Sequence, residues 1–374
     1  MSERERAYMV WLSSIAGIGA KRMLDLCRAY GSAQNVFENA TRAGLLQVHS
    51  VGEQTASALL RACDQAHVED ANRLLEQLDI TAYLLGEPGY PQSLCHIPQP
   101  PPILFATGAR TPQLPKMLAM VGTRRPTRYG RKLAHDLAAE LAKNGVTIVS
   151  GMARGIDACA HQGAIDAGGC TVAVLGCGVD VVYPKEHQRL YAHIRDSGVI
   201  LSEYFPTTAP LAGNFPARNR IISGMSEATF VIESRERGGS LITANFAMEE
   251  GKEVFVLPGN VDSPASMGTN RLMRDGATPV LEAQDLLDAM RWETTYAPNV
   301  QSMEQAPVLD PMEQAVYNLL EQGDLHFDQL VEQSGQAVNV LATCLTLMEI
   351  RGIIKQLPGR IYALNRQANT IAGG

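Results

Sequence analysis

The chain has 374 residues, 45% of them hydrophobic and 19% charged, which is typical of a folded protein of two or three domains and excludes a mainly disordered chain. The net charge of −7 excludes a uniformly basic protein of the histone type, although a local basic surface can still bind phosphate. The seven cysteines include no C-x-x-C pair and no stretch of about 18 apolar residues occurs, so we expect reduced cysteines and a soluble, cytoplasmic protein without membrane contact.

Residues 1–80 carry apolar side chains at three- and four-residue spacing, which predicts a helical domain. Two similar turns interrupt it, Ile18-Gly19-Ala20-Lys21 and Val51-Gly52-Glu53-Gln54, offset by 33 positions (51 minus 18). Both resemble the turns of a tandem helix-hairpin-helix (SAM-like) domain, in which glycine lets backbone amides approach a phosphate. A tight helix-helix connection explains the pattern equally well, because Glu53 stands where the second phosphate would lie. Residues 81–114, with a proline-rich run at 97–102, predict an extended connector.

From 115 to 290, apolar β-branched runs alternate with amphipathic segments, which predicts a Rossmann-like α/β domain with a doubly wound parallel sheet. The expected strands are Met117–Val121, Val146–Val149, Thr171–Leu175, Val199–Leu201, Thr229–Ile232 and Glu253–Leu257. The expected helices are Arg128–Lys143, Ile156–Ala167, His187–Asp196 and Leu241–Glu250.

The last part of the chain predicts a separate winged-helix domain at 309–366, after a linker at 291–308 and before a tail at 367–374. Three helices are expected at Pro311–Glu321, Phe327–Gln333 and Val338–Arg351, followed by a hairpin over Ile353–Leu364. The domain holds four basic against seven acidic side chains, a charge of −3, and its presumptive recognition helix has no basic residue before Arg351. This favours a protein-contact or regulatory role over sequence-specific binding of duplex DNA.

Ligands bind beyond the carboxyl ends of parallel strands, and there this sequence places small-residue turns that enter helices. The first strand is followed by Gly122 and Thr123, and the second ends in Ser150 and Gly151. Such turns expose backbone amides and a helix N-terminus, and the hydroxyls of Thr123 and Ser150 add two donors. Together these groups predict an anion site. Any α/β protein needs glycine at such turns, so the turns alone are weak evidence.

Arginines strengthen that prediction. Arg124 and Arg154 stand at two of the turns, whereas Arg131 and Lys132 fall within an expected helix and fit a solvated charged face. Two further segments follow later strands: residues 215–220 before an apolar turn, and Arg237-Gly238-Gly239-Ser240 entering a helix. Aromatic candidates for base stacking are Tyr129, Tyr183, Tyr204 and Phe215, of which Phe215 and Tyr183 fit a core position equally well.

Several kinds of site have no support in the sequence. A G-x-x-x-x-G-K-[ST] phosphate loop is missing, and Gly176-Cys177-Gly178 lacks the third glycine of the dinucleotide fingerprint. The histidines form no H-E-x-x-H pattern and have no cysteine partners. We therefore expect no cofactor and no metal.

Seven ordered motifs over about 140 residues resemble the DNA-processing protein A family, also called DprA or Smf. In chain order, the motifs are Val121-Gly122-Thr123-Arg124-Arg125-Pro126, Ser150-Gly151-Met152-Ala153-Arg154-Gly155, Val174-Leu175-Gly176-Cys177-Gly178, Leu201-Ser202-Glu203, Phe215-Pro216-Ala217-Arg218-Asn219-Arg220, Gly239-Ser240-Leu241-Ile242-Thr243-Ala244 and Val256-Leu257-Pro258-Gly259. The resemblance implies a non-enzymatic homodimer that binds single-stranded DNA, loads the RecA recombinase onto it and protects incoming strands in natural transformation.

By the same resemblance, Gly122, Thr123 and Arg124 form the phosphate pocket, and further DNA contacts are expected at Arg154, Lys185, Arg218 and Arg220. The turns at the strand ends add Ser150, Gly151, Gly239 and Ser240 as expected contacts to phosphate. His187 stands where many relatives have asparagine. The strand-end turns and their arginines independently fit a flexible single strand, with binding that depends on salt and little on sequence.

A second hypothesis is an enzyme that hydrolyses nucleotides on a related Rossmann-like fold. It would hold phosphate at Gly238-Gly239-Ser240 and use Glu203 or Glu249 as the acid. The number of arginines exceeds what one phosphate requires, which favours the DNA-binding hypothesis. A third hypothesis, a duplex-binding regulator, depends on the winged helix alone and is disfavoured by its charge.

Overall fold

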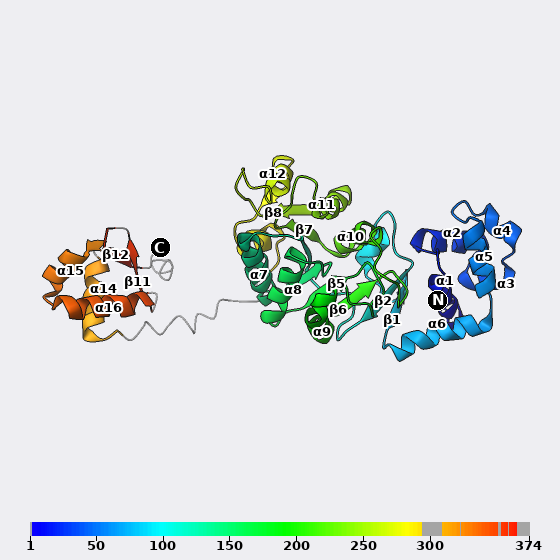
Figure 1. Ribbon diagram of the computed structural model, residues 1–374, viewed down its shortest axis with the longest axis horizontal. Helices are drawn as coiled ribbons and strands as arrows, with labels where there is room; N and C mark the ends of the chain where they lie inside the picture. The colour runs from blue at the N-terminus through cyan, green and yellow to red at the C-terminus, as the bar shows by residue number, and fades with distance from the viewer. Residues whose placement is uncertain (1, 294–308, 322, 351–352, 358, 365–374) are drawn as a thin grey trace. The chain divides into compact units, whose positions relative to one another are not determined.

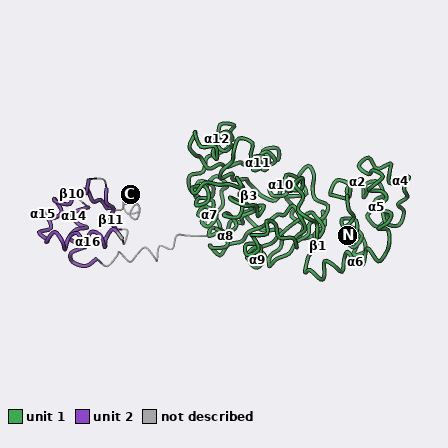
Figure 2. The backbone as a smooth tube through the Cα atoms, in the orientation of Figure 1, with its two compact units in different colours: residues 1–296 green, residues 297–374 purple. Residues whose placement is uncertain are grey.

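The computed structural model describes residues 2–293, 309–321, 323–350, 353–357 and 359–364. The chain divides into two compact units, residues 1–296 and 297–374 (Figure 2). The predicted linker at 291–308 lies outside the described residues from 294 onward, as does the predicted tail at 367–374.

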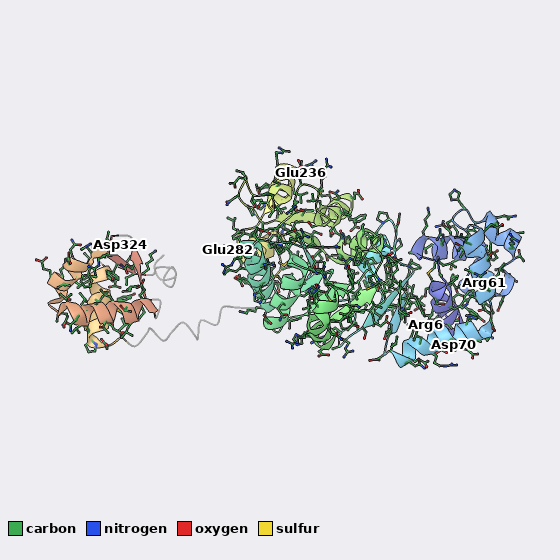
Figure 3. All side chains as sticks on the ribbon, in the orientation of Figure 1. Arg6, Arg61, Asp70, Glu236, Glu282 and Asp324 are labelled. Atoms are coloured by element: carbon green, nitrogen blue, oxygen red, sulfur yellow. The ribbon has the colours of Figure 1, made fainter. Side chains whose placement is uncertain are left out.

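The first unit begins with six helices (Figure 1): α1 (Glu3–Ser14), α2 (Ala20–Tyr30), α3 (Ala33–Asn39), α4 (Arg42–Gln47), α5 (Glu53–Ala62) and α6 (Gln65–Gln77). Fully buried Trp11 lies in their core, and its indole N–H donates to the carbonyl oxygen of Ala62. Gly19 and Gly52 precede α2 and α5 with nearly the same extended backbone, so the two predicted turns are structurally equivalent. Arg6 on α1, labelled in Figure 3, donates to Glu87 at 2.7 Å.

A nine-stranded sheet forms the centre of this unit, in the order β1-β2-β6-β5-β4-β3-β7-β8-β9. The strands are β1 (Thr81–Leu84), β2 (Ile103–Thr107), β3 (Met117–Val121), β4 (Thr147–Ser150), β5 (Thr171–Val174), β6 (Val199–Ser202), β7 (Ala228–Val231), β8 (Glu253–Val256) and β9 (Thr278–Pro279). Strands β3 to β9 pair in parallel, while β1 and β2 add an antiparallel edge. The predicted doubly wound sheet is thus confirmed, but the predicted connector at 81–114 contributes two of its strands.

Both faces of the sheet are covered, because alternate side chains of each strand point to opposite sides. Leu118 and Met120 of β3 pack into one apolar cluster with α7 (Arg128–Lys143), α8 (Ile156–Asp166) and α13 (Ala283–Ala289). Ala119 and Val121 pack into the opposite cluster with α10 (Asn214–Met225), α11 (Ser240–Glu249) and α12 (Met267–Arg274). The remaining short elements are η1 (Gln92–His96), η2 (Lys185–His187) and α9 (Gln188–Ser197).

Helix α10 corrects the prediction of an apolar turn after residues 215–220. Pro216 is the third helical residue of α10, where its missing N–H has no intrahelical partner to lose. The buried side chains of Ile221, Ile222 and Met225 then fix the helix against the sheet.

The second unit contains α14 (Pro311–Glu321), β10 (Leu325–His326), α15 (Phe327–Ser334), α16 (Val338–Ile350), β11 (Ile354–Leu357) and β12 (Ile361–Leu364). Its three strands pair in the order β10-β12-β11. Val316, Leu330 and Leu345, one from each helix, are buried in a core of their own. This arrangement confirms the predicted winged helix.

Candidate nucleic-acid interface

A cavity of about 720 Å³ lies beyond the carboxyl ends of β3 and β7. Strand β4, which follows β3 in the chain, lies on one side of β3, whereas β7 lies on its other side. The order of the strands in the sheet therefore reverses at β3. Open α/β sheets bind ligands in this crevice. Of the predicted site residues, the cavity is lined by Gly122, Thr123, Arg124, Arg218, Gly239 and Ser240.

Arg124 projects from the turn after β3 and is exposed. Its guanidinium carbon lies 5.6 Å from the ring centroid of Phe215, and the Phe215 ring is 5.2 Å from that of Tyr183. A cation and two aromatic rings are therefore gathered at the rim of the cavity, where they can meet a phosphate and the faces of bases. Tyr183 stays 38% exposed, which favours a stacking surface over a core position.

A carboxylate of the protein already occupies the N-terminus of α7. Buried Glu233, after β7, accepts hydrogen bonds from the backbone N–H of Thr127 at 2.9 Å and from its hydroxyl at 2.6 Å. A Cβ atom at Gly130 would collide with this carboxylate, so glycine is required there. The backbone amide at the N-cap of α7 is thus directed at Glu233 rather than at an external anion.

The turn after β4 is filled in the same way by Asp157. Its carboxylate accepts from the backbone N–H of Gly151 at 3.2 Å and of Ala153 at 3.4 Å, and burial raises its pKa while nearby Arg218 opposes the rise. The hydroxyl of Ser150 is buried and donates to the carbonyl oxygen of Met120 at 2.6 Å. Ser150 and Gly151 therefore support the floor of the site and do not face the cavity, contrary to the prediction.

Arg218 forms part of that floor from α10. Its Nη1 donates to the carbonyl oxygens of Gly151, at 2.9 Å, and of Val174. Burial lowers the pKa of Arg218 to about 10, so the side chain remains a cation at neutral pH. A buried cation at the base of a cavity attracts an anion strongly, because little water screens it.

The turn before α11 closes the cavity on the other side. Arg235 and Arg237 are exposed and line the cavity, in the loop where Figure 3 labels Glu236. The buried hydroxyl of Ser240 is 2.9 Å from that of Ser234. Among the hydrogen bonds of the described residues, none joins a carboxylate to the first turn of α11, whereas Glu233 accepts from the N-cap amide of α7. Sequence reasoning placed Arg237 here but missed Arg235, Asn219 and Thr243.

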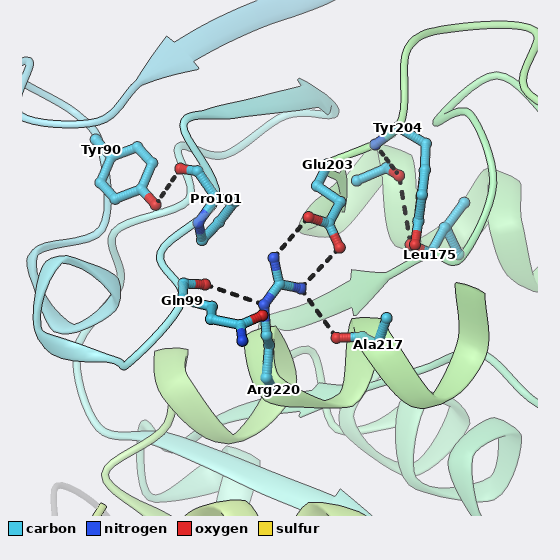
Figure 4. A network of polar contacts seen from close by, with 9 residues as sticks. Tyr90, Gln99, Pro101, Leu175, Glu203, Tyr204, Ala217 and Arg220 are labelled. Carbon is cyan, nitrogen blue, oxygen red and sulfur yellow. Dashed lines mark hydrogen bonds and ion pairs between the residues drawn. The ribbon is translucent and has the colours of Figure 1, made fainter. Parts of the chain in front are cut away.

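Arg220 does not line this cavity and belongs to the polar network drawn in Figure 4. Its guanidinium donates to both carboxylate oxygens of Glu203, at 2.7 and 2.6 Å, and to the backbone oxygens of Gln99 and Ala217. Side chains two residues apart on a helix point about 200° apart, so Arg218 and Arg220 leave α10 on opposite sides. Arg220 is therefore directed at Glu203 and away from the cavity, and its expected contact with DNA stays a prediction.

Two other predicted contacts lie on the surface outside the cavity. Exposed Arg154 forms an ion pair with Glu186, and Lys185 is exposed on η2. His187, the position that departs from the family pattern, contacts the backbone oxygen of Met152 through Nδ1 at 3.0 Å. These residues are available to a strand that extends beyond the cavity.

The acids required by the hydrolase hypothesis lie elsewhere. Glu203 and Glu249 line a second cleft of about 1160 Å³ beside α2, whereas Gly238, Gly239 and Ser240 line the first cavity. Across the described residues, no three His, Cys, Asp or Glu side chains are grouped to hold a metal. Nor does this part of the chain contain a helix with the length and hydrophobicity needed to span a membrane.

Comparison with known proteins gives a consistent result. Residues 81–291 match the family described as DNA recombination-mediator protein A, and residues 300–360 match the DprA winged helix domain. The chain is 30% identical to protein Smf of Synechocystis sp., covering 97% of this chain and 99% of the relative.

Two solved structures are also similar. DNA processing protein A of Streptococcus pneumoniae is 34% identical with a TM-score of 0.64, covering 77% of this chain and 98% of that one. DNA processing protein A of Helicobacter pylori, described for its single-stranded DNA binding mode, is 32% identical with a TM-score of 0.51, covering 56% of this chain and 96% of that one.

Proposed function

The chain belongs to the DNA-processing protein A family, and from this premise we propose that it binds single-stranded DNA in the cavity beyond β3 and β7. The observation that carries the proposal is the excess of cations there. Five arginines line the cavity, Arg124, Arg125, Arg218, Arg235 and Arg237, against the single carboxylate of Asp157, which backbone amides already hold. Such a surface attracts a polyanion.

Single strands suit this cavity better than duplexes do. Arg124, Phe215 and Tyr183 offer a guanidinium and two ring faces, and only unpaired bases can turn to stack on them. The winged helix does not supply a duplex reader, because the described residues of α16 include no lysine or arginine.

The biological role we propose is that of the family: the protein acts in the cytoplasm on DNA taken up in natural transformation, protects the incoming strand and loads RecA onto it. Two copies associate through the Rossmann-like domain. The DNA-processing names of the relatives and the single-strand binding described for the Helicobacter pylori protein support this role. No catalysis is proposed, because the turn at Gly238–Ser240 and the acids Glu203 and Glu249 lie at different clefts.

Fluorescence anisotropy with labelled single-stranded and duplex oligonucleotides of the same length tests the binding. We expect clear preference for the single strand, similar affinity across sequences and a steep loss of affinity with salt. Equal affinity for both forms would contradict the proposal. Release of base or phosphate from nucleoside monophosphates would instead support the hydrolase hypothesis.

The RecA and dimer proposals need their own measurements. RecA assembly on single strands coated with single-strand-binding protein, followed by its DNA-dependent ATPase rate, should accelerate when this protein is added. Light scattering during gel filtration should give the mass of two chains. A monomer, or an unchanged RecA rate, would contradict the respective proposal.

A further inference from the structure

The outer face of α7 carries an exposed aromatic ring among arginines, directly beside the cavity. We propose that a DNA strand leaving the cavity continues over the first two turns of α7, where one base stacks on Tyr129 and Arg128 and Arg131 hold phosphates. This surface, which we call the α7 patch, comprises Arg125, Arg128, Tyr129 and Arg131. The proposal rests on the proposed function and extends the site beyond the cavity.

Tyr129 is unusual for a tyrosine at a helix start. Its side chain is 54% exposed, and among the interactions of the described residues it has no hydrogen bond and no aromatic partner. Buried Tyr90, by contrast, uses its hydroxyl, which donates to the carbonyl oxygen of Pro101 at 2.7 Å. An exposed ring with a free face is the element on which single-strand binders stack a base.

The arginines of the patch are also unpaired. Within the described part of the chain, Arg125, Arg128 and Arg131 have no side-chain ion pair or hydrogen bond, whereas Lys132 on the same helix pairs with Asp136 at 2.6 Å. Exposed Arg154, by contrast, is neutralised locally by Glu186. A cluster of uncompensated cations repels itself unless an anion lies across it.

Helix geometry places these side chains together. Successive side chains of a helix are rotated by about 100°, so Arg128, Tyr129, Arg131 and Lys132 lie within an arc of about 160°. The centre of this arc is opposite the face of α7 that packs on the sheet through buried Ala134 and Leu137. Arg125 belongs both to this patch and to the lining of the cavity, so the two surfaces are continuous. The helical part of the patch extends about 4.5 Å along the axis from Arg128 to Arg131.

This combination identifies nucleic acid as the occupant. An acidic protein surface would need the arginines but would leave the ring of Tyr129 without a role. Guanidinium groups alternating with an exposed ring, joined to a cavity of the same chemistry, match alternating phosphates and bases.

The experiment compares two oligothymidylates, one of about four nucleotides that fills only the cavity and one of about twenty that also reaches the patch. Tyr129→Ala should weaken binding of the longer strand by about 5- to 150-fold and leave the shorter strand unaffected. Tyr129→Phe should retain the wild-type affinity, because the ring face is kept. The double variant Arg128→Ala/Arg131→Ala should lower the slope of log affinity against log salt by about 1.4 for the longer strand only.

Lys143→Ala is the matched control, because Lys143 is exposed on the same helix but about 18 Å from Arg131 along its axis, and it should bind both strands as the wild type does. Unchanged affinity of the Tyr129→Ala variant for the longer strand would overturn the α7 patch, as would an equal loss on both strands. Loss of both strands in Arg124→Ala, with no effect of the patch variants, leaves the proposed function intact and rejects the patch. Failure of the wild type to bind either strand rejects both proposals.

Discussion

Arg124 lies over the ring of Phe215, with its guanidinium carbon 5.6 Å from the ring centroid. The two residues come from the turn after β3 and from α10, about 90 positions apart in the chain, so the fold rather than local sequence brings them together. The contact orients an otherwise exposed side chain towards the cavity.

Replacing Arg124 by alanine should be the most damaging single loss for DNA binding. We expect single-strand affinity to fall by about 1.5–3 kcal/mol, the range for a charged hydrogen bond, and the salt slope to fall by about 0.7. The melting temperature should hardly change, because Arg124 is exposed. Salt-titrated anisotropy beside a thermal melt checks this, with Lys143→Ala as the control. Unchanged affinity in a folded Arg124→Ala protein would remove Arg124 from the site.

Arg220 should behave in the opposite manner. Its ion pair with Glu203 is largely buried, with side-chain exposures of 10% and 7%, so Arg220→Met leaves a buried carboxylate unpaired and should destabilise the fold by about 3–5 kcal/mol. Adding Glu203→Gln should restore much of the lost stability, because the unpaired charge is gone. Urea unfolding measures both effects. The affinity of the folded Arg220→Met protein for DNA should equal that of the wild type, and a specific loss of affinity would return Arg220 to the DNA contacts.

His135 links α7 to α8 and predicts a pH dependence. Its ring nitrogens lie 2.9 Å from Asp166 and 3.2 Å from Asp136, and the hydrogen bond to Asp166 is the main cause of its raised pKa. A raised pKa means that the folded state binds the proton more tightly. The stabilisation is therefore fully present below the ordinary histidine pKa of 6.5 and is lost as the pH rises through the raised value.

Thermal melts across that window should show the wild type losing stability relative to His135→Gln, whose side chain cannot become charged. Parallel pH profiles of the two proteins would contradict the assignment. His161 serves as a contrast, because burial lowers its pKa to about 3 and it stays neutral throughout.

A fragment of residues 1–296 should bind single-stranded DNA as tightly as the full chain. All residues of the cavity and of the α7 patch lie within it, and the unit has its own core. A cut at residue 105 should instead prevent folding, because β2 pairs with β6 through Phe105 and Ser202 and the Phe105 side chain is fully buried. Circular dichroism and anisotropy test both fragments. Substantially weaker binding by the 1–296 fragment would show that the second unit contributes to the interface.

The sequence predicted the regular part of this fold well, for a physical reason. Strand β3 and helix α7 lie at the residues expected, because continuous apolar runs and three- to four-residue periodicity report burial directly. The sequence predicted an apolar turn after residues 215–220 and no helix there, although proline is tolerated in a first helical turn. The resemblance implied that both Arg218 and Arg220 contact DNA, whereas the helix directs them to different sides.

The site was predicted in part. Gly122, Thr123, Arg124, Gly239 and Ser240 line one cavity, and their contacts with DNA stay predictions. What sequence could not supply was the pairing of distant groups. Nothing in the sequence marks Glu233 and Asp157 as acceptors of backbone hydrogen bonds, because only the folded structure brings each carboxylate to its amides. Ser150 was misjudged for the same reason, because its hydroxyl turns inward to the carbonyl oxygen of Met120.

Glu233 and Asp157 give the cavity a shape that does not depend on its ligand. Since these carboxylates already accept from the amides of Thr127, Gly151 and Ala153, departure of a phosphate leaves those N–H groups paired and their backbone held in place. The difference in free energy between the empty and the occupied cavity then comes mainly from arginine–phosphate contacts and the counterions they displace. A strand held in this way can be exchanged at a rate set by the ionic environment, without a refolding step, as the proposed transfer of the strand to RecA requires.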